Sequence, residues 1–261
     1  MPAASLAWRE IIRFLRQRSR VIGGFATPVL FWLLLGSGLG QSFRAGGSPT
    51  GGEGAGGYME YFFTGSIVMI VLFTAIFSTI STIEDRSEGF LQSVIVSPAA
   101  RSSIAAGKIL GSAILATLHA SVFLALAPLI GFDLSLSKAL AMVAILFVLS
   151  LGLSGLGFII AWSMDSTQGF HSVMNLLLLP MWMLSGAAFP ASGASAWLAT
   201  AMGVNPLTYG VAALRRTLEA GHASTDPAGP SWPLSIAVTC GFAVLMLAVA
   251  TWQVSWKRKA A

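Results

Sequence analysis

Long apolar runs without Asp, Glu, Lys or Arg dominate this chain of 261 residues. They cover 21–43, 61–83, 109–132, 139–164, 166–214 and 227–256. Because a helix crosses the hydrocarbon core of a bilayer in about 20 residues, all of these runs except 166–214 fit one transmembrane helix each. The run at 166–214 is too long for one span and is interrupted by Pro180, Pro190 and Pro206. It contains either two spans, or one span followed by a re-entrant segment.

The basic residues decide between these alternatives. Several arginines precede the first run, and Lys257, Arg258 and Lys259 follow the last one. Flanks rich in Lys and Arg stay in the cytoplasm, so both chain ends are predicted to be cytoplasmic, which requires an even number of spans. We therefore predict an all-α polytopic membrane protein, one domain over 1–261. Its six spans are expected at about 21–43, 61–83, 107–131, 139–163, 171–189 and 234–254, with a re-entrant segment at 191–214.

Composition supports this class and excludes others. Hydrophobic residues make up 55% of the chain and charged residues 10%, whereas a soluble domain carries about 25% charged residues. Disordered chains are also poor in apolar residues. The net charge is +5, but the basic residues lie at the ends of apolar runs and form no aromatic-lined groove, which excludes nucleic acid as a partner. The single cysteine, Cys240, excludes a disulfide framework and cysteine-based zinc sites.

Segment 5–20 has the pattern of an amphipathic helix. Apolar residues recur on one face and arginines on the opposite face, at Trp8, Ile11, Ile12 and Leu15 and at Arg9, Arg13, Arg16 and Arg20. A helix of this kind lies in the headgroup layer of the bilayer. It is either a plain lipid anchor or a helix that relays force from a cytoplasmic partner.

Segment 84–101 is the main charged interruption on the predicted cytoplasmic side. Its acidic start is followed by a glycine that permits a turn, a short apolar stripe, and a Ser-Pro pair that ends a helix. These features are carried by Glu84, Asp85, Arg86, Glu88, Gly89, Leu91, Val94, Ser97 and Pro98. We predict a short cytoplasmic helix whose apolar face docks on a partner. The alternative is an amphipathic loop that rests on lipid.

The predicted spans carry little chemistry. His119 is their clearest ionisable residue, and we expect it to hydrogen-bond between helices. The sequence has no acidic proton relay, no HExxH, and no G-x-x-x-x-G-K-[ST] phosphate loop. Gly152-Leu153-Ser154-Gly155 matches the G-x-S-G of rhomboid-type proteases, but such small residues also suit close helix packing. We expect no catalytic site, no metal site and no nucleotide-binding domain in this chain.

Three stretches, taken in order, resemble the ABC-2 type permease, the membrane subunit of many ATP-binding-cassette exporters. They are FLRQRSRVIGGFATPVLFWLLLGSGLG, EDRSEGFLQSVIVSPAARSSIAAGK and MWMLSGAAFPASGASAWLATAMGVNPLTYGVAALR. The resemblance implies six spans per subunit and two permease subunits per pore, as a homodimer or a heterodimer. It also implies cytoplasmic ATPase subunits that bind ATP and Mg, and a place in the plasma (bacterial inner) membrane.

The resemblance also implies roles for individual residues. Segment 84–101 would be the coupling helix, with Glu84 and Glu88 pairing with arginines of the amino-terminal helix or of the ATPase, and Leu91 and Val94 docking on the ATPase. The remaining candidates for coupling are Asp85, Arg86, Gly89, Ser97, Pro98 and Arg101, together with Arg9, Arg13 and Arg16 of the interfacial helix. The candidates for the external gate are Pro180, Ser185, Gly186, Pro190, Asn205, Pro206 and Tyr209.

The sequence therefore predicts an integral membrane permease that exports a drug, a lipid-linked molecule or a saccharide, driven by a separate ATPase. Two alternatives come from other classes of protein. One is a secondary transporter or channel that works without an ATPase, and the other is an intramembrane serine protease.

Overall fold

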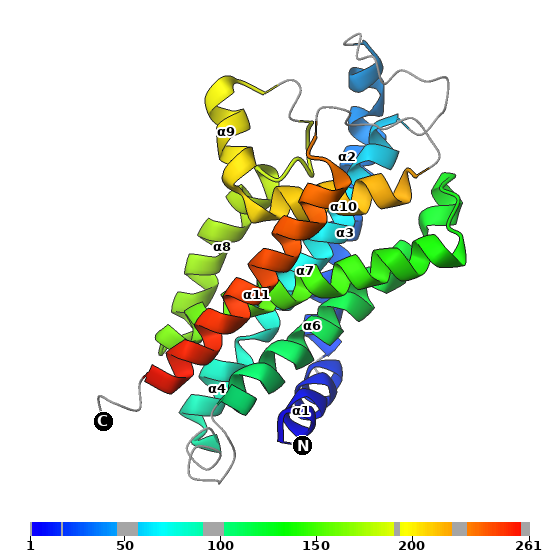
Figure 1. The fold of residues 1–261 in the computed structure, drawn as a ribbon. Helices are drawn as coiled ribbons and strands as arrows, with labels where there is room; N and C mark the ends of the chain where they lie inside the picture. The colour runs from blue at the N-terminus through cyan, green and yellow to red at the C-terminus, as the bar shows by residue number, and fades with distance from the viewer. Residues whose placement is uncertain are drawn as a thin grey trace.

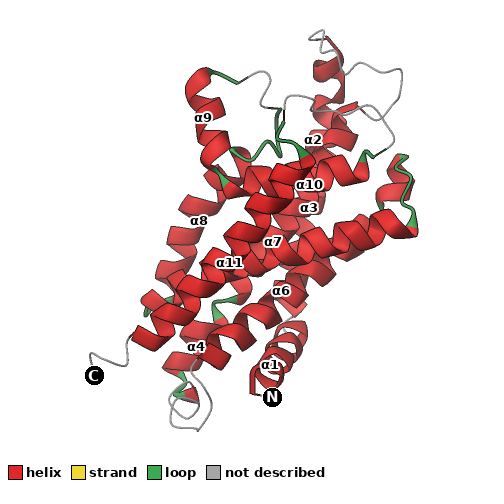
Figure 2. Ribbon diagram, viewed as in Figure 1, coloured by secondary structure: helices red, strands yellow, loops and turns green. Residues whose placement is uncertain are grey.

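The computed structural model describes residues 2–16, 18–45, 57–90, 102–190, 194–220 and 229–256. Within these ranges the regular structure is entirely helical, which confirms the predicted all-α class (Figures 1 and 2). The helices are α1 (Pro2–Arg16), α2 (Arg18–Ala45), α3 (Gly57–Ser78), α4 (Ser81–Ser87), α6 (Ser102–Leu124), the short 3-10 helix η1 (Ala127–Ile130), α7 (Leu136–Ser163), α8 (Thr167–Met183), α9 (Ala196–Val204), α10 (Pro206–Leu218) and α11 (Trp232–Trp256).

Four helical stretches within the described residues are long and apolar enough to cross a membrane. They are Tyr58–Ser87, Ser102–Ile130, Leu136–Ser163 and Trp232–Ser255, and they overlap four of the predicted spans. The predicted span at 21–43 falls in α2, whose apolar part is the shorter stretch Ile22–Gly38. The predicted span at 171–189 begins in α8, which ends at Met183. The count of six spans and the re-entrant segment stay predictions.

Helix α3 forms the centre of the bundle. A helix that is apolar all round is buried on all sides, and 89% of the apolar window of Tyr58–Ser87 is buried, against 22% for α11. Phe63 of α3 lies in an aromatic cluster with Trp32 of α2 and Phe123 of α6, with ring centroids 5.0 to 5.8 Å apart. The neighbouring helices therefore surround α3.

The amino-terminal helix packs closely on α6. The predicted helix at 5–20 covers most of α1 and the start of α2, and residue 17 between them lies outside the described residues. Gly107 and Gly111, four residues apart on one face of α6, allow this contact. A Cβ atom at Gly107 would lie 2.8 Å from the carbonyl oxygen of Ala3, and one at Gly111 would lie 3.0 Å from that of Ala7. Small residues at this spacing let two helix backbones approach each other.

The small residues of α7 are also packing positions. A Cβ atom at Gly152 would lie 2.5 Å from the Phe242 ring of α11, and one at Gly157 would lie 3.1 Å from the Cα atom of Ile76 in α3. Ser154 lies between them and is completely buried. This geometry confirms the packing interpretation of the Gly152-Leu153-Ser154-Gly155 tetrapeptide.

Candidate functional site

A cluster of charged residues is formed where α1, α4 and α6 meet. At its centre, the Asp85 carboxylate accepts hydrogen bonds from Arg9 (2.9 and 3.0 Å), Arg13 (2.7 Å) and Lys108 (2.6 Å). Each carboxylate oxygen accepts two of these bonds, which fills the acceptor capacity of the group. We call the seven residues Arg9, Glu10, Arg13, Glu84, Asp85, Glu88 and Lys108 the Asp85 cluster.

Lys108 is the deepest cation of the Asp85 cluster, with 1% of its side chain exposed. Its ammonium donates to Asp85, to Glu10 of α1 at 2.8 Å and to Ser81 of α4 at 3.2 Å. All three N–H groups are therefore used. Removing one partner of a buried ion pair costs about 3–5 kcal/mol, because the other charge is left buried without compensation. Lys108 thus ties α6 to both α1 and α4.

The outer part of the Asp85 cluster is open to solvent. Arg13 donates to Glu84 at 3.0 Å and to Glu88 at 3.4 Å, and the Glu88 side chain is 59% exposed. The guanidinium of Arg9 lies 3.7 Å from the centre of the Phe90 ring, and its hydrogen bonds with Asp85 raise the pKa of Arg9 above its ordinary value. Exposed ion pairs are worth at most about 1 kcal/mol. The stability of the Asp85 cluster therefore comes mainly from its buried part.

Arg86 makes its contacts on another side of α4 than Asp85. It donates to the carbonyl oxygens of Trp162 at 2.7 Å and Met164 at 3.1 Å, and to the Asp165 carboxylate at 3.0 Å. These carbonyls lie at the end of α7, where a helix has unpaired acceptors and favours a cation. Helix α4 is therefore attached to α1 and α6 on one side, and to the end of α7 on the other.

The structure places the coupling candidates as follows. Arg9, Arg13, Glu84, Asp85 and Glu88 lie together in the Asp85 cluster, whereas Arg86 lies outside it and Arg16 is exposed. The backbone of Gly89 has a φ of +76°, in agreement with the predicted turn. Leu91, Val94, Ser97, Pro98 and Arg101 lie outside the described residues. The coupling role of all these residues stays a prediction.

The sequence analysis missed Glu10 and assigned no partner to Lys108. One signal could have drawn attention to both. Lys108 is the charge at the start of a long apolar run, and Glu10 is the acidic residue of an arginine-rich helix. An ionisable residue at such a position requires a partner of opposite charge.

A second group of polar contacts holds the irregular segment 184–190, which follows α8. The carbonyl oxygen of Gly186 accepts hydrogen bonds from Tyr61 at 2.6 Å and Arg215 at 3.1 Å. Tyr58 donates to the carbonyl oxygen of Ala188 at 3.0 Å. Gly186 has a backbone φ of +75°, which residues other than glycine rarely adopt. Buried backbone carbonyl groups outside a helix require hydrogen-bond partners of this kind.

Asn205 connects the last turn of α8 to the start of α10. Its side-chain amide donates to the carbonyl oxygen of Met181 at 2.6 Å, and its side-chain oxygen accepts from the backbone N–H of Leu207 at 3.0 Å. The second bond is an N-cap, and Pro206 occupies the first position of the helix, which suits proline.

The structure brings only some of the gate candidates together. Gly186 and Asn205 make the contacts described above, and Ser185 donates to the carbonyl oxygen of Trp182. Tyr209 instead bonds the carbonyl oxygen of Gly203. Pro180 lies within α8, and Pro190 ends the described part of the segment. Tyr58, Tyr61 and Arg215, which bind the segment from α3 and α10, were not predicted.

The described residues contain no group of three or more His, Cys, Asp or Glu side chains that could hold a metal ion. Both groups of contacts join helices. One is the Asp85 cluster at the start of segment 84–101, and the other is formed by Tyr58, Tyr61 and Arg215 around segment 184–190. These contacts hold the joined helices in one arrangement.

Comparison with known proteins gives three matches over much of the chain. A family model described as ABC-2 type transporter matches residues 3–218. A putative transport permease, ycf38, from Cyanophora paradoxa is 26% identical over 80% of this chain and 71% of its own length. Nodulation protein J from Rhizobium leguminosarum bv. viciae is 25% identical over 84% of each chain.

A shorter match is the probable multidrug ABC transporter permease YbhR of Escherichia coli strain K12. It is 28% identical over 51% of this chain, which corresponds to 36% of its own length. The region matched by the family model includes both contact groups and ends at the last residue of α10, before α11 begins.

Proposed function

Because the chain belongs to the ABC-2 type transporter family, we propose that it is the permease subunit of an export complex driven by a separate cytoplasmic ATPase. It is a multi-pass membrane protein and a membrane subunit of an ABC transporter. The sequence contains no phosphate-binding loop, so ATP and Mg would be bound by the partner.

The Asp85 cluster is the observation that carries the proposal. It joins α1, α4 and α6 at the start of segment 84–101, which the family resemblance implies to be the coupling helix. Arg86 adds the end of α7 to the same unit. A displacement of segment 84–101 by the ATPase would therefore move several membrane helices together. The buried ion pairs resist separation, so the movement is transmitted rather than absorbed.

The position of the helix ends supports the proposed topology. Helices α1 and α4 and the carboxyl end of α11 lie toward one end of the bundle, and α9 lies toward the opposite end (Figure 1). In the proposed topology the first end faces the cytoplasm, and segment 184–190 with α9 and α10 forms the gate at the outer side. The gate and the Asp85 cluster would each have two arrangements, and ATP binding would shift both to the second arrangement together.

A second permease subunit would complete the pore. Helices α2 and α8 expose large apolar side chains that the described chain leaves uncovered, among them Leu30 and Leu34 of α2 and Leu176 and Leu179 of α8. In the complex these faces would meet either lipid or the second subunit. The cargo would be a drug, a lipid-linked molecule or a saccharide, and one of the relatives is a probable multidrug permease.

Affinity purification of the tagged chain from its native membrane tests the proposal. We expect an ABC ATPase to co-purify, and we expect transport by the reconstituted complex to require ATP hydrolysis. Transport by the isolated chain in liposomes without ATP would contradict the proposal and favour a secondary transporter or channel.

A further inference from the structure

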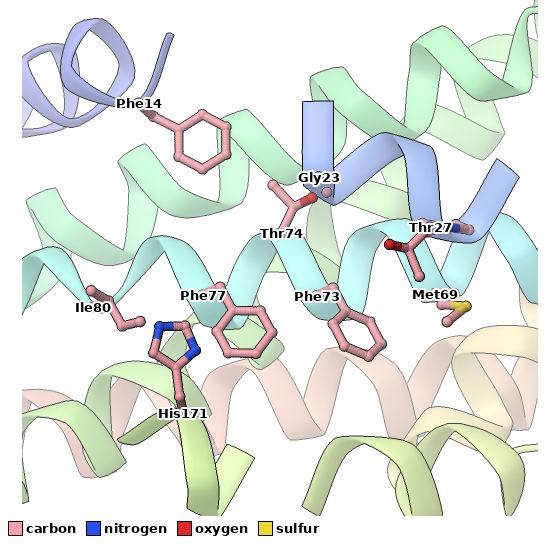
Figure 3. A pocket seen from close by; sticks show the side chains of 11 residues that line it. Phe14, Gly23, Thr27, Met69, Phe73, Thr74, Phe77, Ile80 and His171 are labelled. Carbon is pink, nitrogen blue, oxygen red and sulfur yellow. The ribbon is translucent and has the colours of Figure 1, made fainter. Parts of the chain in front are cut away.

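A cavity of about 310 Å³ lies between α1, α2, α3 and α8 (Figure 3). Its walls are mainly apolar and aromatic, with Phe14 from α1, Pro28 from α2, Phe73 and Phe77 from α3, and Ile80 from the turn between α3 and α4. The volume is at the lower end of the range for small-molecule sites. The contacts that form the Asp85 cluster and those that hold segment 184–190 involve none of these residues.

The cavity has aromatic surfaces and a few hydrogen-bonding groups. The rings of Phe77 and His171 lie 5.0 Å apart, and Figure 3 shows them side by side. The polar side chains in the lining are Thr27, Thr74 and His171, and Thr74 lies 3.3 Å from the ring nitrogen of His119. None of the eleven described lining residues is Asp, Glu, Lys or Arg.

We propose that this cavity binds a small uncharged aromatic compound with one or two hydrogen-bonding groups. A charged ligand would lose its hydration without gaining a counter-charge from these walls. A saccharide would find too few polar partners for its hydroxyl groups. Aromatic rings instead gain from stacked and edge-to-face contacts with Phe73, Phe77 and the imidazole of His171. The acyl chain of a membrane lipid shares the apolar part of this chemistry, and the experiment below separates the two.

Phe14 connects the cavity to the amino-terminal helix. It belongs to α1, and its ring lies 5.4 Å from that of His119 in α6. The same helix carries Arg9 and Arg13, which bind Asp85. A ligand in the cavity would therefore contact α1, the same helix that supplies Arg9 and Arg13 to the Asp85 cluster.

Two glycines of α2 provide a matched pair of variants. Added Cβ atoms at Gly23, which lines the cavity, and at Gly38, which does not, would each meet no other atom within 4 Å. Gly23→Leu therefore fills the cavity from an open position. Gly38→Leu makes the same chemical change in the same helix and leaves the cavity intact.

Photolabelling tests the site in the full complex, reconstituted in lipid nanodiscs. The probe is 3-trifluoromethyl-3-phenyldiazirine, the competitor is 4-biphenylmethanol, and adducts are mapped by mass spectrometry. We expect adducts on peptides that contain Phe73 and His171. Their yield should fall about tenfold when the competitor is present at about ten times its Kd. Adducts on the exposed Leu176 should not respond to the competitor.

The variants and a lipid probe complete the test. Gly23→Leu should remove the competitor-sensitive adducts and Gly38→Leu should keep them. Thr27→Leu fills the same cavity and serves as a second test where Gly23→Leu does not accumulate. Cavity adducts that ignore the competitor, or that persist in Gly23→Leu, would overturn the proposal. So would labelling of the cavity by a diazirine-bearing acyl chain that 4-biphenylmethanol does not displace. The result is independent of any transport measurement.

Discussion

The ammonium of Lys108 lies 2.6 Å from the carboxylate of Asp85, and both side chains are buried. The two residues come from α6 and α4, and Glu10 of α1 completes the contact. An ion pair in this position holds three helices in one arrangement. In the proposed transporter these are the interfacial helix α1, helix α4 at the start of segment 84–101, and the membrane span α6.

Lys108→Met should destabilise the chain by about 3–5 kcal/mol, because Asp85 and Glu10 are left without their buried cation. The double variant Lys108→Met with Asp85→Asn should lose less than the two single variants together, since the two residues interact directly. Thermal unfolding of the purified chain in detergent measures both effects. Additive losses would show that the two residues do not act as a pair.

Glu88→Gln should leave the free energy of unfolding within about 1 kcal/mol of the wild type, because its contact with Arg13 is exposed. We nevertheless expect Glu88→Gln, and deletion of residues 91–94, to abolish ATP hydrolysis linked to transport while membrane insertion persists. Hydrolysis stimulated by cargo in the reconstituted complex measures this coupling. Normal coupling in both variants would remove segment 84–101 from the coupling role.

Gly111→Leu should displace α1 from α6, since even a Cβ atom would lie 2.9 Å from Glu10 and 3.0 Å from the carbonyl oxygen of Ala7. Helix α1 contains several arginines, so its release should be detected as faster cleavage by trypsin in inside-out vesicles. Gly241→Leu in α11 is the matched control, because a Cβ atom there meets nothing within 4 Å. Equal cleavage of the two variants would mean that α1 is held by other contacts.

Tyr61→Phe should loosen segment 184–190, because the carbonyl oxygen of Gly186 loses its shortest hydrogen bond. The expected cost is about 1 kcal/mol in stability. A cysteine at Ala188 should also react faster with a maleimide added from outside. Tyr209→Phe removes an exposed hydroxyl contact with Gly203 and should change neither quantity. If Tyr61→Phe also leaves the reaction rate unchanged, Tyr61 does not hold the segment.

Sequence patterns predicted the elements of this protein better than the contacts between them. The helices around the charged segment 84–90 and the turn at Gly89 follow from local composition. The contact between Lys108 and Glu10 joins residues that are 98 positions apart, so no local period shows it. Tyr61 and Arg215 likewise meet at Gly186 only because α3, α10 and segment 184–190 converge in the fold.

The side of the membrane that α4 faces is the most direct test of the central claim, which is that an ATPase acts on the chain through the Asp85 cluster. Ser87 at the end of α4 and Thr200 of α9 are both exposed, and the two helices lie toward opposite ends of the bundle (Figure 1). Each can be replaced by cysteine after Cys240→Ser removes the single native thiol.

A membrane-impermeant maleimide should label Ser87→Cys only in inside-out vesicles and Thr200→Cys only in right-side-out vesicles. Added ATPase should protect Ser87→Cys from the reagent. Labelling of Ser87→Cys from the outer side would place the Asp85 cluster out of reach of a cytoplasmic ATPase and contradict the account.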